Sequence, residues 1–313
     1  MEIKNYKKTD EKHILELFKN SFGKSMSLEY WKWRFLQNPF DTSTYISLMW
    51  DNQLLVGHYA VSPVQMVFER KLQKTCLSMT TMTHSNYFGR GIFSQLSENL
   101  YAKLKSEDFE MVWGFPNNNS HYGFKKNLNW KDINIIPMMN ISKEKVDKLK
   151  TKVTYLKHAI IGDVIQKSLN LIDARIRINK TKAYLNWRYV NNPIADYKII
   201  SLEGYVNSVV IYKKIPSFSK LNTFEIDIME LYFCDDLDVL KKLIYAISLE
   251  EKEDIIKFNL WKNIYDYNQI FFEKIGFIYS QPLTYLGYRS FTNNLLPENM
   301  KNWDISLGYS DVY

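Results

Sequence analysis

Hydrophobic and polar positions along the chain form two series that predict the same order of strands and helices. In the first series, an alternating run from Tyr45 to Trp50, a polar turn at Asp51-Asn52-Gln53 and a second run over 54–61 predict a β-hairpin. In the stretch 91–105, apolar residues recur at helical spacing and indicate a helix. After the hairpin we expect a strand, a helix, a strand and a helix over residues 74–84, 91–105, 110–115 and 119–127.

The second series begins near the middle of the chain. Runs from Tyr197 to Leu202 and from Tyr205 to Tyr212, separated by Glu203-Gly204, predict another hairpin. Because strands and helices mix in both series, we expect an α/β fold of two tandem lobes, each a mixed, mostly antiparallel sheet flanked by helices. The second hairpin is followed by a predicted strand, helix, strand and helix over residues 224–233, 236–249, 254–260 and 265–275.

A ten-residue motif supports a duplication. Residues 30–39 read YWKWRFLQNP and residues 184–193 read YLNWRYVNNP, so that Tyr, Trp, Arg, an aromatic residue, Asn and Pro match without a gap. We assign Trp33-Arg34 and Trp187-Arg188 to packing, because an aromatic ladder on a helix most often belongs to a core. The lysine-rich stretch that joins the two series places the lobes at 1–145 and 146–313.

Composition narrows the classes of function. The longest apolar runs fall short of the roughly 18 residues of a membrane helix, and the N-terminus lacks a signal-peptide core, so we expect a cytoplasmic protein without a membrane partner. Cys76 and Cys234 lie far apart, which predicts neither a disulfide scaffold nor a thiolate metal site. The net charge of +7 suits an anionic ligand. A nucleic-acid partner is not expected, because the lysines form no block.

A short glycine loop lies between the third strand of the first series and the helix that follows it. Gly89 and Gly91 let the backbone approach a ligand, and the free N–H groups at a helix start form an anion site. Arg90 adds positive charge. A plain strand-to-helix turn is the alternative.

Residues 86–91 resemble the Q/R-x-x-G-x-G/A signature of the GNAT acyltransferase superfamily, with Asn86 in place of Gln or Arg. The segment over 113–130 resembles the family's second hallmark, in which Asn118 matches the family's Asn and Lys125 stands where a Tyr is usual. The second lobe keeps the family's Gly-Phe pair at Gly276-Phe277. The resemblance covers both lobes and implies an acyl-coenzyme A, such as acetyl-CoA, as acyl donor, without a metal.

The resemblance also implies which residues hold the coenzyme. A backbone N–H on the strand before the loop would polarise the thioester carbonyl. Asn118 or Asn119 would orient the coenzyme or a water, or would cap the helix instead. The expected coenzyme-binding residues are Met82, Thr83, His84, Phe88, Gly89, Arg90, Gly91, Ile92, Asn118 and Asn119.

Direct attack of an amine on the thioester needs a general acid for the thiolate and a general base for the ammonium. Tyr122 is the first candidate for the acid and Lys125 the second, although both also read as ordinary side chains of a short helix. His84 is the first candidate for the base because the reference pKa of histidine lies near neutrality. A structural role at the strand end is its alternative, and His121 and His58 are weaker candidates.

The second lobe carries Cys234-Asp235-Asp236-Leu237-Asp238 where the glycine loop belongs, and carboxylates there would repel a pyrophosphate. We therefore expect coenzyme A to bind only the first lobe. The predicted function is transfer of an acyl group to the amine of a small molecule, with an amino sugar as the leading acceptor. An aminoacyl-tRNA-dependent transferase and a non-catalytic binding or regulatory protein remain alternatives.

Overall fold

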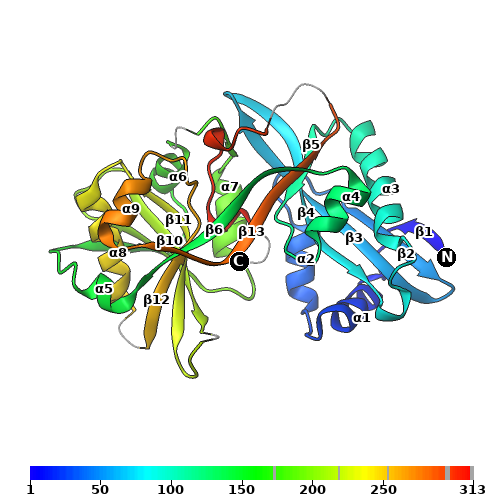
Figure 1. Ribbon diagram of the computed structural model, residues 1–313, viewed down its shortest axis with the longest axis horizontal. Coiled ribbons are helices and arrows are strands. Elements are labelled where there is room, and N and C mark those ends of the chain that lie inside the picture. Colours follow the sequence, from blue (N-terminus) through cyan, green and yellow to red (C-terminus); the bar gives the residue numbers. More distant parts are fainter. Residues whose placement is uncertain (172–173, 218, 252–253, 293–296, 311–313) are drawn as a thin grey trace. The chain divides into compact units, whose positions relative to one another are not determined.

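The computed structural model describes residues 1–171, 174–217, 219–251, 254–292 and 297–310 (Figure 1). The chain divides into two compact units. Unit 1 comprises Met1–Ile133 and Tyr285–Glu298, and unit 2 comprises Asn134–Thr284 and Asn299–Tyr313. Each unit contains a sheet of parallel and antiparallel strands flanked by helices, which confirms the predicted α/β class.

The sheet of unit 1 runs in the order β1-β2-β3-β4-β5-β13. Only β4 and β5 pair in parallel, and the other neighbours whose register is resolved are antiparallel. The elements of unit 1 are β1 (Glu2–Asn5), α1 (Glu11–Phe22), α2 (Leu28–Leu36), β2 (Tyr45–Asp51), β3 (Leu54–Phe68), β4 (Lys71–Thr83), α3 (Ile92–Ser106), β5 (Met111–Gly114), α4 (His121–Leu128) and the end of β13 (Ile278–Ser290).

The sheet of unit 2 runs in the order β6-β12-β11-β10-β9-β7, with β11 and β12 as its parallel pair. The elements are β6 (Lys131–Ser142), which begins in unit 1, α5 (Lys143–Asp147), β7 (Tyr155–His158), α6 (Asp163–Asn170), β8 (Ile176–Ile178), α7 (Lys182–Leu185), a π-helical turn (Asn186–Val190), β9 (Tyr197–Leu202), β10 (Ser208–Pro216), β11 (Phe224–Phe233), α8 (Leu237–Glu250), β12 (Ile255–Leu260) and α9 (Gln269–Ile275).

The two units exchange their last strands. β6 follows α4 in the sequence but pairs with β12 of unit 2, through Met139–Ser142. β13 follows α9 but pairs with β5 of unit 1, where Gly287 lies opposite Gly114. The lysine-rich stretch predicted one boundary at residue 145, whereas the compact units divide the chain at Ile133 and give Tyr285–Glu298 to unit 1.

Helices cover both faces of the sheet in unit 1 (Figure 1). A Cβ on Gly57 would lie 2.4 Å from Cγ2 of Ile92, so this position of β3 faces α3. The next side chain, His58, points to the opposite face and contacts the ring of Phe35 in α2. The core on the α3 side also includes Phe124 and Trp130, whereas in unit 2 the corresponding core packs α5, α8 and α9 on the sheet.

The repeated motif is capped in the same way in both units, although its middle is α-helical in unit 1 and continues as a π-helical turn in unit 2. Ser27 caps α2 by accepting a hydrogen bond of 3.1 Å from the N–H of Tyr30, and Thr181 caps α7 by accepting one of 3.1 Å from Tyr184. Near the end of the motif, Asn38 and Asn192 each accept from the N–H two residues on. Trp33, Arg34, Trp187 and Arg188 are buried, as their assignment to packing predicted.

The last helix of the second series begins later than the sequence predicted. A helix was expected from residue 265, but α9 begins at Gln269. Asn263 accepts from the N–H of Tyr265, and Asp266 accepts from the N–H of Asn268. These two Asx turns hold the backbone outside the helix over residues 263–268.

Candidate functional site

The glycine loop leaves a row of backbone donors without partners. Gly89 and Gly91 have φ of 76° and 71°, the left-handed region that favours glycine. A Cβ on Gly89 would meet no described atom within 4 Å, so the backbone angle, rather than crowding, calls for glycine. Within the described residues, no hydrogen bond uses the N–H groups of 89–94, and the first internal bond of the helix joins Gln95 N–H to Gly91 O. Free N–H groups at a helix start attract anions.

The parallel strands β4 and β5 separate next to this loop. Their last paired residues are Leu77 and Trp113. At the following position, a Cβ on Gly114 would lie only 3.4 Å from the carbonyl oxygen of Ser78. β4 then continues to Thr83 without β5 beside it, which leaves one edge of the strand open for a ligand.

A bulge in β4 turns its backbone at this point. The register with β3 shifts between His58 and Ala60, opposite Thr80, whose φ is 49°. Nδ1 of His58 lies 2.8 Å from the carbonyl oxygen of Thr80, so this nitrogen carries the proton and donates it. Burial lowers the pKa of His58 to about 4. A neutral, fully buried ring is a structural member of the sheet and has no access to substrate.

One backbone group at the end of β4 points toward the open edge. The N–H of His84 donates to the carbonyl oxygen of Val56 on β3, at 2.9 Å. Because neighbouring residues of a strand direct their backbone groups to opposite sides, Thr83 faces away from β3. Its carbonyl oxygen accepts from Oγ of Ser21 instead. Three residues were expected around the thioester carbonyl. Met82 is buried, the N–H of His84 is bonded to β3, and Thr83 carries the N–H that is directed away from β3.

The side chains of the loop contact one another. Nδ1 of His84 accepts from the N–H of Asn86 at 3.3 Å, so the neutral ring holds its proton on Nε2. The guanidinium of Arg90 lies 4.5 Å from the ring centre of Tyr87 and donates to the carbonyl oxygen of Asn86. Phe88 is exposed. These contacts fix the conformation of the turn and leave the backbone N–H groups of 89–94 without hydrogen-bond partners among the residues that the structure describes.

Helix α4 lies against the first turn of α3. The rings of Phe124 and Phe93 are 5.1 Å apart, and a Cβ on Gly123 would lie 3.5 Å from the ring of Phe93. Tyr122 is 66% exposed, and the ammonium of Lys126 lies 5.2 Å from its ring centre. The structure therefore places Tyr122 on the helix beside the glycine loop, with its side chain in solvent.

A carboxylate joins His121 and Lys125 of α4. Nε2 of His121 donates to Asp132 at 2.7 Å, and Nζ of Lys125 donates to it at 2.6 Å. Burial acts to raise the pKa of Asp132, but these two donors hold it below its usual value. The imidazole also stacks on Tyr285 of β13, with ring centres 3.8 Å apart and planes 9° from parallel. Sequence reasoning named His121 only as a weak candidate and missed both of its partners.

The turn before α4 is held by a different asparagine, and no side chain caps the helix itself at Ser120. Asn117, rather than Asn118 or Asn119, accepts hydrogen bonds from backbone N–H groups, those of Asn119 and Ser120. Asn118 and Asn119 are exposed. Their side chains remain available to a ligand at the end of β5.

Comparison with known proteins identifies the first part of the chain. Residues 2–132 match the acetyltransferase (GNAT) domain family. A search of curated protein sequences finds no significant match.

Solved structures share the fold of most of the chain. A GCN5-related N-acetyltransferase from Anabaena variabilis is 9% identical with a TM-score of 0.70, and 93% of this chain and 73% of that chain are covered. A probable N-acyltransferase from Enterococcus faecalis is 15% identical with a TM-score of 0.69, covering 93% and 72%. N-myristoyltransferase from Saccharomyces cerevisiae, solved with bound myristoyl-CoA, is 10% identical with a TM-score of 0.63, covering 92% and 82%.

The corresponding position in unit 2 lacks the open donors of the GNAT domain. Asp236 precedes α8, and its side chain accepts from the N–H groups of Asp238 and Val239 at 2.7 and 3.4 Å. The helix start is therefore capped from within the chain. Among the described residues, no helix combines the length and apolar character needed to span a bilayer, and no cluster of three ionisable ligands suited to a metal is found.

Proposed function

We propose that the GNAT domain transfers an acetyl or other acyl group from coenzyme A to the amine of a small molecule, with an amino sugar as the leading acceptor. The observation that carries this proposal is the row of free N–H groups over 89–94, next to the edge of β4 that β5 leaves open. The donors suit the pyrophosphate of the coenzyme. The open strand edge suits its extended pantetheine arm.

Polarisation of the thioester is assigned to the N–H of Thr83. This group points toward the open edge, and an aligned donor lowers the energy of the oxyanion that forms as the amine attacks. Tyr122 is the proposed acid for the departing thiolate, because it lies on α4 beside the loop and its side chain is free in solvent. Lys125 is less suited, because its ammonium is paired with Asp132.

Two histidines compete for the role of general base. In His84, the Nδ1 lone pair already accepts a hydrogen bond and Nε2 carries the proton. Neither nitrogen therefore offers a free lone pair to the attacking amine. In His121, Asp132 holds the proton on Nε2 and leaves the Nδ1 lone pair to take a proton from the attacking amine. The geometry favours His121. Profiles of kcat/KM against pH for His84→Ala and His121→Ala decide between them, because only loss of the base removes the acidic limb.

Thermal shift with acetyl-CoA, desulfo-CoA and tRNA tests the donor. Stabilisation by both coenzymes supports the proposal, whereas stabilisation by tRNA alone would favour an aminoacyl-tRNA-dependent transferase. Release of free thiol is then followed in the presence of a panel of small amines. A protein that binds the coenzyme but releases no thiol with any amine would be a binding or regulatory protein.

A further inference from the structure

Unit 2 contains a cavity of about 280 Å³ at the position that corresponds to the coenzyme site of unit 1. Its walls come from the ends of β11 and β12, the turn before α9, and the segment from Lys301 to Ser306. β11 and β12 are the parallel pair of this unit, and their last paired residues are Ile228 and Leu260. As in unit 1, the cavity opens where the two strands separate, which is where ligands bind in such sheets.

Two buried polar atoms that line the cavity have no partner among the described residues. Oδ1 of Asn268 is one of them, on a side chain that is 5% exposed, and Oγ of Ser306 is the other, at 9%. A buried oxygen without a hydrogen bond destabilises the fold, because it has lost its contact with water. A ligand that donates hydrogen bonds to these atoms would remove this destabilisation.

The charges around the cavity are unequal. Four carboxylates line it, those of Glu230, Asp235, Asp266 and Asp304. The buried ammonium of Lys180 lies 2.8 Å from Glu230 and 3.0 Å from Asp304, so one cation serves two anions.

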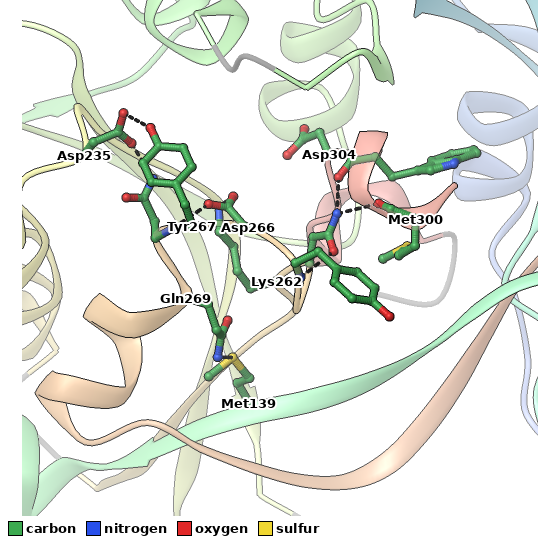
Figure 2. Close-up of polar contacts among 12 residues, drawn as sticks. Met139, Asp235, Lys262, Asp266, Tyr267, Gln269, Met300 and Asp304 are labelled. Carbon is green, nitrogen blue, oxygen red and sulfur yellow. Dashed lines mark hydrogen bonds and ion pairs between the residues drawn. The ribbon is translucent and has the colours of Figure 1, made fainter. Parts of the chain in front are cut away.

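The other carboxylates differ in what they contact (Figure 2). Asp266 is paired with Lys262 at 2.5 Å. Asp235 accepts only from the neutral donors Tyr267 Oη and Asn268 Nδ2, and no cation in the described part of the chain pairs with it. Even with the ammonium of Lys301 on the wall, the cavity carries one more negative than positive charge.

Aromatic rings form part of the wall. Tyr265 and Tyr267 are 51% and 69% exposed at the mouth, whereas Trp303 is buried. Asn263 fixes the segment that carries Trp303, because its Nδ2 donates to the carbonyl oxygens of Met300 and Trp303, both at 2.7 Å. Rings of this kind stack on the C–H faces of a sugar or on a cation.

We propose that this cavity binds a hydroxylated ammonium compound of about monosaccharide size. The ammonium would pair with Asp235, the hydroxyl groups would donate to Asn268 and Ser306, and the tyrosine rings would cover the carbon skeleton. This inference concerns binding in unit 2 and does not depend on acyl transfer by the GNAT domain.

The test is calorimetric titration of the full chain with D-glucosamine, and with D-glucose and N-acetyl-D-glucosamine, which share the ring but lack the positive charge. Glucosamine should bind several-fold more tightly than either neutral sugar, because only its ammonium can pair with Asp235 and an ion pair at an exposed site is weakened by solvent. Asp235→Asn should abolish this preference. Asp238→Asn, on the exposed face of α8 and outside the cavity, is the matched control and should keep it.

Absence of glucosamine binding at millimolar concentration would overturn the proposal, and so would equal binding of the three sugars or equal effects of the two aspartate variants. If Asp235→Asn does not fold, Ser306→Ala replaces it and should weaken glucosamine binding several-fold. A titration with coenzyme A alone reports on the GNAT domain, so its failure and that of the cavity are read separately.

Discussion

Gly89→Glu tests whether the glycine loop holds a pyrophosphate. The φ of 76° costs any non-glycine residue about 1–2 kcal/mol of stability, but the new Cβ meets no described atom within 4 Å. The fold should therefore persist. A carboxylate about 4 Å from a phosphate in solvent is repelled by about 1 kcal/mol per charge, so two phosphate charges give about 2 kcal/mol and roughly a 30-fold loss of coenzyme A affinity.

Gly89→Gln is the matched control, because it has the same backbone cost and nearly the same shape without the charge. The difference in coenzyme A affinity between the Glu and Gln variants, measured by calorimetry, should be about 30-fold at low salt and should shrink at high ionic strength. Gly204→Glu in unit 2, also at a φ of 76°, should lower stability without changing coenzyme affinity. Equal affinities of the Glu and Gln variants would refute the assignment of the loop.

Three further predictions concern single side chains. Tyr122→Phe should lower kcat about 10²–10⁴-fold with the KM for coenzyme little changed, and full activity in a steady-state assay would remove Tyr122 from the mechanism. His58 has a folded pKa of about 4 against 6.5 when unfolded, so the unfolded state binds the extra proton, and stability that is complete above pH 6.5 falls by about 3 kcal/mol as the pH drops to 4. His58→Gln should lose this component in urea denaturation, and an unchanged pH dependence would contradict the reasoning. Gly308→Ala would place a Cβ 2.1 Å from the hydroxyl oxygen of Tyr189 and should destabilise unit 2 by about 1–3 kcal/mol in calorimetry. Gly162→Ala has open space around it and changes only the N-cap of α6, so it should lower stability less; equal melting temperatures would show that the site of Gly308 relaxes freely.

Local signals predicted much of the fold. Strand β11 and helix α3 lie within one residue of their expected positions, because their hydrophobic spacing reflects a single buried face. The glycine loop was also readable, since glycine is the residue that adopts its backbone angles without strain. The delayed start of α9 was missed because two Asx turns, which depend on side-chain geometry, compete with the helix.

Contacts between distant segments could not be predicted in the same way. His121 becomes a candidate base only through Asp132, which lies beyond the end of its helix, and through Tyr285, which comes from far along the chain. His58 is the opposite case, because its burial removes it from the candidate bases. In the sequence it looks like any other titratable histidine. The strand exchange is likewise invisible to periodicity, because β6 and β13 would look the same whichever sheet they joined.

The place of β13 bears on how the protein matures during translation. Nascent domains generally fold from the N-terminus as they leave the ribosome. The GNAT domain is synthesised first, yet its sheet lacks the strand beside β5 until residues 287–290 have emerged. Until then the edge of β5 is unpaired and open to other chains. Slow translation or premature termination in the second half would therefore expose the first half to aggregation, and chaperones that shield strand edges would be needed most at that stage.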